Sequence, residues 1–154
     1  ALLALMAGMN FAGSSVAGWL ADRVGDRPIT FIGTIITATG LILAGSAGSA
    51  PTMATVVIAT AVLGFGFGIH QAAVYALTLR GTPSEHTGAI SAALTVSQTI
   101  GTVLSIALMT SLINWQQSSN GSTFVEAYRF TYFIAAGIAV VAGVIVLKFH
   151  RKSI

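Results

Sequence analysis

Five long apolar runs, separated by short polar stretches, make up almost the whole chain. A transmembrane helix needs about 20 consecutive apolar residues, because each residue advances it by about 1.5 Å across a hydrocarbon layer about 30 Å thick. No run shows the polar–apolar alternation of a membrane-barrel strand. The pattern therefore predicts an all-α, polytopic transmembrane helical bundle. Its five spans are predicted at about residues 1–20, 29–48, 52–79, 87–113 and 125–147.

Short polar connections join the predicted spans, so consecutive spans must run antiparallel. Residues 21–28 form a hairpin with four charged side chains in six consecutive positions. Residues 45–51 are predicted to form a short turn and residues 80–86 a second charged turn. Residues 114–124 are predicted to form the longest polar loop.

Basic residues fall almost entirely on one side when the spans alternate in direction. Arg129 alone falls on the other side. Cytoplasmic loops of membrane proteins carry an excess of Lys and Arg. We therefore predict a multi-pass protein of the plasma (inner) membrane with the first hairpin and the C-terminus in the cytoplasm. The residues on that side are Arg23, Arg27, Arg80, Lys148, Arg151 and Lys152.

Composition supports a lipid environment and argues against several functions. The chain is 55% hydrophobic and 7% charged, with a mean hydropathy of +0.86, whereas soluble domains carry about 25% charged residues. It has no cysteine, which excludes disulfides and thiolate metal sites. It has no basic stripe for nucleic acid, no nucleophile–base cluster and no metal-ligand spacing. We therefore expect neither an enzyme nor a bound metal or cofactor.

Small residues recur at helical spacing inside the apolar runs and predict helix-packing faces. Gly64-x-Gly66-x-Gly68 lies within a span rather than between a strand and a helix, so it is not a phosphate loop. Further packing faces are predicted from the spacing of other small residues. These are Ser97/Gly101/Ser105 and Ala139/Gly143.

The first hairpin resembles a motif of the major facilitator superfamily. Residues 18–27 read Gly-Trp-Leu-Ala-Asp-Arg-Val-Gly-Asp-Arg. The family signature, Gly-x-Leu-Ala-Asp-Arg-x-Gly-Arg-Arg/Lys, lies between the second and third helices of each six-helix half. Asp26 stands where the family usually has a basic residue. The resemblance implies that this chain supplies five spans of a six-helix major facilitator half, and that upstream helices are missing.

Two later stretches resemble the last two helices of the fourteen-helix drug:proton antiporter branch. They are Gly88-x-x-Ser91…Gln98-x-x-Gly101…Ala107 and Phe124-x-x-Ala127-Tyr128-Arg129-x-Thr131. The arginine and the Gly-Pro pair that mark the N-terminal half of such proteins are absent from the third and fourth spans. We therefore expect the C-terminal half, with a missing N-terminal half as its partner.

The resemblance assigns a conformational latch to the hairpin. Asp22 would accept hydrogen bonds from arginine or from a helix N-terminus, with Arg23 and Arg27 as partners, and would hold the two halves together in one state of the cycle. Gly18 and Gly25 would permit close packing and the tight turn. The alternative is that these charges only set the topology.

His70 is the one ionisable residue well inside a predicted span. Such residues tend to face the bundle interior, and the resemblance implies that this span lines a central cavity. We predict that His70 and Gln71 contact substrate, with Gln98 as a further polar cavity residue. Alternatively, His70 is a neutral histidine bonded to a neighbouring helix, and Gln98 only joins helices.

The resemblance implies a secondary active transporter that works by alternating access. We predict proton-coupled export of drugs or other hydrophobic small molecules, with substrate, protons and the lipid bilayer as partners. No acidic residue lies deep in a span, so a proton-carrying carboxylate would lie outside this chain. The alternatives are a metabolite or sugar symporter and a non-transporting membrane module.

Overall fold

A computed structural model of the chain shows five long helices and no strand over the residues that it describes, which are 1–47, 51–80, 82–121 and 123–149. All five are long and apolar enough to cross a membrane. The all-α transmembrane fold predicted from the sequence is therefore confirmed. The elements are α1 (Leu2–Val24), α2 (Asp26–Ser46), α3 (Met53–Leu79), the short 3-10 helix η1 (Ser84–His86), α4 (Thr87–Asn120) and α5 (Phe124–Phe149).

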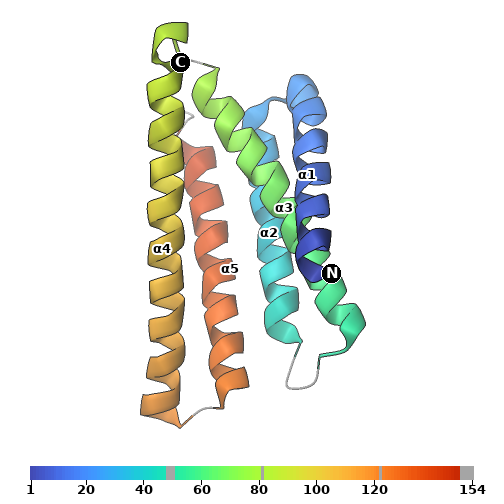
Figure 1. Cartoon of the computed structure of the whole chain (residues 1–154), viewed down its shortest axis with the longest axis vertical. Coiled ribbons are helices and arrows are strands. Elements are labelled where there is room, and N and C mark those ends of the chain that lie inside the picture. Colours follow the sequence, from blue (N-terminus) through green and yellow to red (C-terminus); the bar gives the residue numbers. More distant parts are fainter. Residues whose placement is uncertain (48–50, 81, 122, 150–154) are drawn as a thin grey trace.

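Consecutive long helices run antiparallel (Figure 1). Helix α3 packs closely against both α1 and α2, α5 packs on α2, and α4 contacts mainly α5. We use "hairpin end" for the end of the bundle that holds the α1–α2 turn, the α3–α4 connection and the last turn of α5. The opposite end, which holds the α4–α5 connection, is the "far end".

The charged hairpin is more helical than predicted. Helix α1 continues to Val24 and α2 begins at Asp26, so of the predicted connection only Gly25 is non-helical, with φ +91. The helices include the charged residues of the hairpin. Arg23 lies in the last turn of α1 and Asp26 in the first turn of α2. Both placements are favourable to the helix dipoles.

The predicted polar loop at residues 114–124 is also mostly helical. Helix α4 continues to Asn120 and ends at Gly121, which has a left-handed φ of +61. Helix α5 then begins with reciprocal bonds between Thr123 and Glu126, at 3.0 and 3.4 Å. This arrangement is a capping box. Polar composition alone could not end α4, because polar side chains beyond the hydrocarbon layer are compatible with a helix.

Glycines bring α3 into backbone contact with two helices at once. A Cβ on Gly64 would lie 2.6 Å from the carbonyl oxygen of Met6 on α1, and one on Gly66 would lie 2.6 Å from the backbone nitrogen of Thr37 on α2. Gly68 lies against the backbone of Asn10, again on α1. The predicted glycine packing face is confirmed, and it consists of two faces that alternate along α3.

The other small-residue faces have different outcomes. A Cβ on Gly143 would lie 3.0 Å from Cγ2 of Thr34, so α5 packs on α2 there. A Cβ on Gly101 would meet no atom within 4 Å among the described residues. The packing face predicted around Gly101 is therefore open in this structure.

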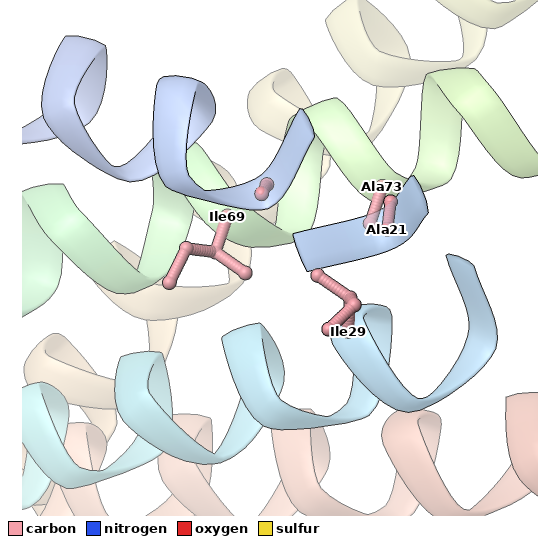
Figure 2. Close-up of a cluster of buried hydrophobic side chains, with 5 residues drawn as sticks. Ala21, Ile29, Ile69 and Ala73 are labelled. Carbon is pink, nitrogen blue, oxygen red and sulfur yellow. The ribbon is translucent and has the colours of Figure 1, made fainter. Parts of the chain in front are cut away.

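A small apolar core near the hairpin end joins the first three helices (Figure 2). Ala21 of α1, Ile29 of α2, and Ile69 and Ala73 of α3 are buried together. Ile29 and Ala73 are fully buried. This core positions the neighbouring charged residues of the hairpin end.

Candidate functional site

Two carboxylates share one guanidinium at the hairpin end. Nε of Arg80 lies 2.9 Å from Oδ2 of Asp26, and Nη2 of Arg80 lies 3.3 Å from Oδ1 of Asp22. The Asp26 side chain is 6% exposed and that of Asp22 is 78% exposed. Asp26 is therefore the buried partner and Asp22 the peripheral one. Together these contacts tie the α1–α2 turn to the end of α3.

Local structure explains why a carboxylate is buried at this position. Asp26 is the first residue of α2, where free N–H groups and the helix dipole favour negative charge. Its Oδ1 atom has no hydrogen-bond partner among the described residues. Two carboxylates thus share one guanidinium in this cluster.

The predicted latch residues are close in space, but their partners differ from those expected. Asp22 contacts Arg80 rather than Arg23 or Arg27. The guanidinium of Arg23 instead lies 4.0 Å from the ring centroid of Trp19, a cation–π contact on α1. Arg27 is half-buried and makes no ion pair among the described residues.

Gly18 and Gly25 also have different outcomes. Gly25 provides the tight turn, since its φ of +91 is one that L-residues rarely adopt. A Cβ on Gly18 would meet no atom within 4 Å among the described residues, so the close packing expected there stays a prediction. Sequence reasoning missed Asp26 and Arg80 as partners. A usable signal existed, because the positive-inside pattern already placed Arg80 on the side of the hairpin.

The three predicted cavity residues line one groove between α3 and α4. We call it the polar groove; its volume is about 560 Å³. Helix α3 contributes His70 and Gln71, and α4 contributes Gln98. The structure therefore brings the three together, and their contact with substrate stays a prediction.

A stripe of hydroxyl groups on α4 also lines the polar groove, and sequence reasoning did not single it out. The residues recur three or four positions apart, which places them on one helix face. This spacing is visible in the sequence and could have predicted the stripe. Its members are Thr95, Thr99, Thr102 and Ser105.

Helix α2 holds the ring of His70. Nδ1 of His70 lies 3.0 Å from the Thr34 hydroxyl, and that hydroxyl donates its hydrogen to the carbonyl oxygen of Thr30 at 2.9 Å. The backbones meet closely, because a Cβ on Gly33 would lie 2.6 Å from the His70 backbone nitrogen. His70 thus lines the groove and bonds a neighbouring helix, so both predicted roles are compatible.

Tyr75 connects the two walls of the polar groove. Its hydroxyl lies 3.4 Å from Thr95 Oγ1 and 3.4 Å from Gln98 Oε1. Gln98 therefore bonds another helix as well as lining the groove. These contacts are long and exposed, so the α3–α4 connection is weak.

A second groove lies between α4 and α5. We call it the apolar groove; its volume is about 500 Å³. Its lining includes Leu104, Leu108 and Met109 of α4 and Ile138 of α5, and it shares Gly101 and Ser105 with the polar groove. The two grooves therefore meet. Over the described part of the chain, no three His, Asp or Glu side chains gather closely enough to hold a metal ion.

Five apolar membrane-length helices with a charged tight hairpin define an integral, multi-pass membrane protein. Residues 1–153 match the Major Facilitator Superfamily. The chain belongs to this superfamily of membrane transporters.

Curated relatives with similar sequences come from mycobacteria. A triacylglyceride transporter of Mycolicibacterium hassiacum is 34% identical over 110 residues, which cover 63% of this chain and 20% of the relative. A triacylglyceride transporter of Mycolicibacterium smegmatis is 34% identical over 108 residues, covering 63% of this chain and 19% of the relative. The chain thus matches about a fifth of the length of these relatives.

Proposed function

We propose that this chain is part of a secondary active transporter that exports hydrophobic small molecules by alternating access, coupled to proton entry. The observation that carries this proposal is the junction of a polar and an apolar groove in one membrane-spanning bundle. Membership in the superfamily supports transport. The cargo that we propose includes drugs and acylglycerol lipids, because similar proteins are named triacylglyceride transporters.

The ion cluster at the hairpin end is the proposed conformational latch. Asp26 holds Arg80 from a buried position, while Asp22 approaches the same guanidinium from an exposed one. Asp22 is therefore the carboxylate that can exchange partners when helices move, and a contact that forms in only one state biases a two-state equilibrium. The partner that Asp22 takes in the other state would lie in the remainder of the transporter.

Proton coupling would need, apart from the latch, a group that binds and releases the coupled proton. No carboxylate lines either groove among the described residues. His70 is the ionisable side chain at the polar groove. We therefore propose that the main proton-carrying carboxylate lies outside this chain and that His70 contacts cargo.

The proposed orientation places the hairpin end in the cytoplasm. Arg23, Arg27, Arg80 and Lys148 lie at that end, and Arg129 lies near the far end. Arg151 and Lys152, which also entered the charge count from the sequence, lie outside the described residues. The excess of positive charge at the hairpin end supports this orientation.

The test is transport by the full transporter in everted membrane vesicles with an imposed pH gradient. The probes are ethidium and a fluorescent triacylglycerol. We expect uptake of at least one probe that collapses when the gradient is dissipated. Uptake that ignores the gradient would contradict proton coupling. If neither these probes nor a fluorescent diacylglycerol moves, hydrophobic export is contradicted and a metabolite symporter or a non-transporting module is favoured.

A matched pair of variants tests the latch in the same assay. Asp22→Asn should reduce uptake about tenfold at unchanged expression, because the amide loses its charge attraction to Arg80. Glu85→Gln removes an exposed carboxylate of η1 that makes no ion pair among the described residues, and it should leave uptake unchanged. Equal uptake by both variants and the wild type would contradict the proposed latch.

A further inference from the structure

We infer that the two grooves together bind one neutral amphiphile, with a hydroxyl-bearing head in the polar groove and an apolar tail in the apolar groove. This inference rests on the proposed function and deepens it by naming the chemistry of the cargo. It depends on which hydrogen-bonding groups the polar groove presents, on its charge, and on its continuity with the apolar groove.

The α4 hydroxyl stripe presents acceptors rather than donors. A hydroxyl has one hydrogen and two lone pairs. Each hydroxyl of the stripe already donates its hydrogen to a carbonyl oxygen of its own helix, so only lone pairs are left for the groove. The four bonds run from Thr95 to Ser91, from Thr99 to Thr95, from Thr102 to Gln98 and from Ser105 to Thr102, at 2.8 to 3.0 Å.

His70 presents an acceptor for the same reason. The 2.9 Å bond to the Thr30 carbonyl favours a Thr34 hydroxyl that accepts from His70. The hydrogen of the neutral imidazole is therefore assigned to Nδ1, which leaves Nε2 with a free lone pair. Thr34 is a positioning residue, since it sets the tautomer without lining the polar groove.

These acceptors match a ligand that donates, and the amides of Gln71 and Gln98 in the same groove can both donate and accept. No carboxylate lines the polar groove among the described residues. An ammonium group in a membrane-embedded site is costly without such a partner. A hydroxyl group meets the acceptors without that cost. A fully esterified lipid has no donor to offer and would leave them unpaired.

The apolar groove is the continuation of the polar one. The two share Gly101 and Ser105, and a Cβ on Gly101 would meet no atom within 4 Å in the part of the chain that the structure describes. The junction is therefore open. Each volume, about 560 and about 500 Å³, lies in the usual range for small-molecule sites. An alkyl or acyl tail that leaves a head near Gln98 and His70 can enter directly between α4 and α5.

The test compares two probes that differ by one donor. They are a fluorescent 1,2-diacylglycerol and the same molecule with its hydroxyl converted to a methyl ether. In the vesicle assay the full transporter should move the hydroxyl probe about tenfold faster at limiting concentration, because one buried hydrogen bond separates the two.

Variants of α2 connect that preference to the histidine tautomer. Thr34→Val should reduce the hydroxyl preference to near one while transport of the ether probe is unchanged. Thr34→Ser should restore the preference, because it restores the hydroxyl. Thr37→Val is the matched control on the same helix, since its hydroxyl bonds the Gly33 carbonyl rather than His70. A purely structural role for Thr34 would change transport of both probes equally.

Four outcomes would overturn the inference. Equal rates for the two probes would do so, as would faster transport of an amine-headed probe with the same tail. Transport of ethidium or triacylglycerol without the diacylglycerol would also do so, although the proposed function would stand. Lastly, Gly101→Leu should block diacylglycerol transport at normal expression; unchanged transport, or a failure to fold because another helix occupies the junction, would overturn the inference. If no probe moves at all, the proposed function fails first.

Discussion

Helices α3 and α4 form the two walls of the polar groove, yet the structure holds them in opposite ways. Helix α3 has backbone contacts with both α1 and α2 through Gly64, Gly66 and Gly68 and buries Ile69 and Ala73. The described part of α4 has no buried residue and meets α3 through the hydroxyl of Tyr75.

This difference in packing indicates which wall of the polar groove is held more tightly. Where a glycine brings two backbones into contact, no side chain can rearrange between them. The distance between the two helices is therefore fixed. Contacts between the tips of side chains tolerate shifts through rotamer changes. Over the described residues α3 is the tightly packed wall of the groove and α4 the loosely packed one, and we call them the fixed and the adjustable wall. The outward apolar side chains of α4, such as Val103 and Ile106, need lipid or further helices around them.

The largest expected effect comes from adding one methyl group to the fixed wall. Gly66→Ala would place a Cβ 2.6 Å from the Thr37 backbone nitrogen, so α2 and α3 must separate. We expect a loss of about 3 kcal/mol in unfolding free energy, measured by denaturation in mixed micelles. Gly101→Ala on α4 is the control and should cost nothing, since its Cβ meets open space. Equal losses would remove the distinction between the two walls.

The next effect tests the fixed wall at the hairpin end. Arg80→Met leaves the carboxylate of Asp26 buried without a cation, which should cost about 2 kcal/mol in unfolding free energy. Adding Asp26→Asn to that variant should recover part of the loss. Asp22→Asn alone should cost at most about 0.5 kcal/mol because Asp22 is exposed. A larger loss from Asp22→Asn than from Arg80→Met would reverse the assigned roles.

A smaller effect is expected at the turn between α1 and α2. Gly25→Ala forces an L-residue to φ +91, ψ +159, a region that essentially only glycine occupies, and should cost about 1 kcal/mol or more. Gly18→Ala, seven positions earlier in the same motif, should be neutral because nothing lies near its Cβ. The comparison is made by thermal unfolding of the purified protein. A neutral Gly25→Ala would mean that the turn does not depend on a left-handed residue.

The smallest effect should arise at the adjustable wall. Tyr75→Phe removes the two 3.4 Å contacts between α3 and α4, and we expect about 0.5 kcal/mol of destabilisation or less. The distance distribution between spin labels on α3 and α4 should broaden, while that between α2 and α3 should be unchanged. Broadening of the α2–α3 distribution would argue that α3 is not fixed.

Several features could be predicted from residues that lie near one another in the sequence. The apolar runs predicted five spanning helices, since helix length and lipid compatibility are local properties. Helical spacing predicted the packing face of Gly64 and Gly68 on α3. Helix ends were less predictable, because charged and polar residues at residues 21–24 and 114–120 remain helical beyond the hydrocarbon layer.

The pairings between helices could not be predicted. Arg80 and Asp22 are 58 positions apart, and His70 and Thr34 are 36 positions apart. Which side chains meet at such separations depends on the rotation and height of each helix relative to its neighbours. A hydropathy pattern leaves both quantities free. It could not show that Asp22 pairs with Arg80 rather than with Arg23 or Arg27.

The sequence by itself determined the number of helices, their antiparallel order, the tight turn at Gly25 and the membership of the superfamily. It did so because apolar length, charge placement and a glycine turn act within one stretch of chain. Only the tertiary structure decided that Asp26 holds Arg80, that the Thr34 hydroxyl lies 3.0 Å from Nδ1 of His70, and that the two grooves meet at Gly101. These features follow from how α2, α3, α4 and α5 pack, since each needs groups from separate helices at bonding or contact distance.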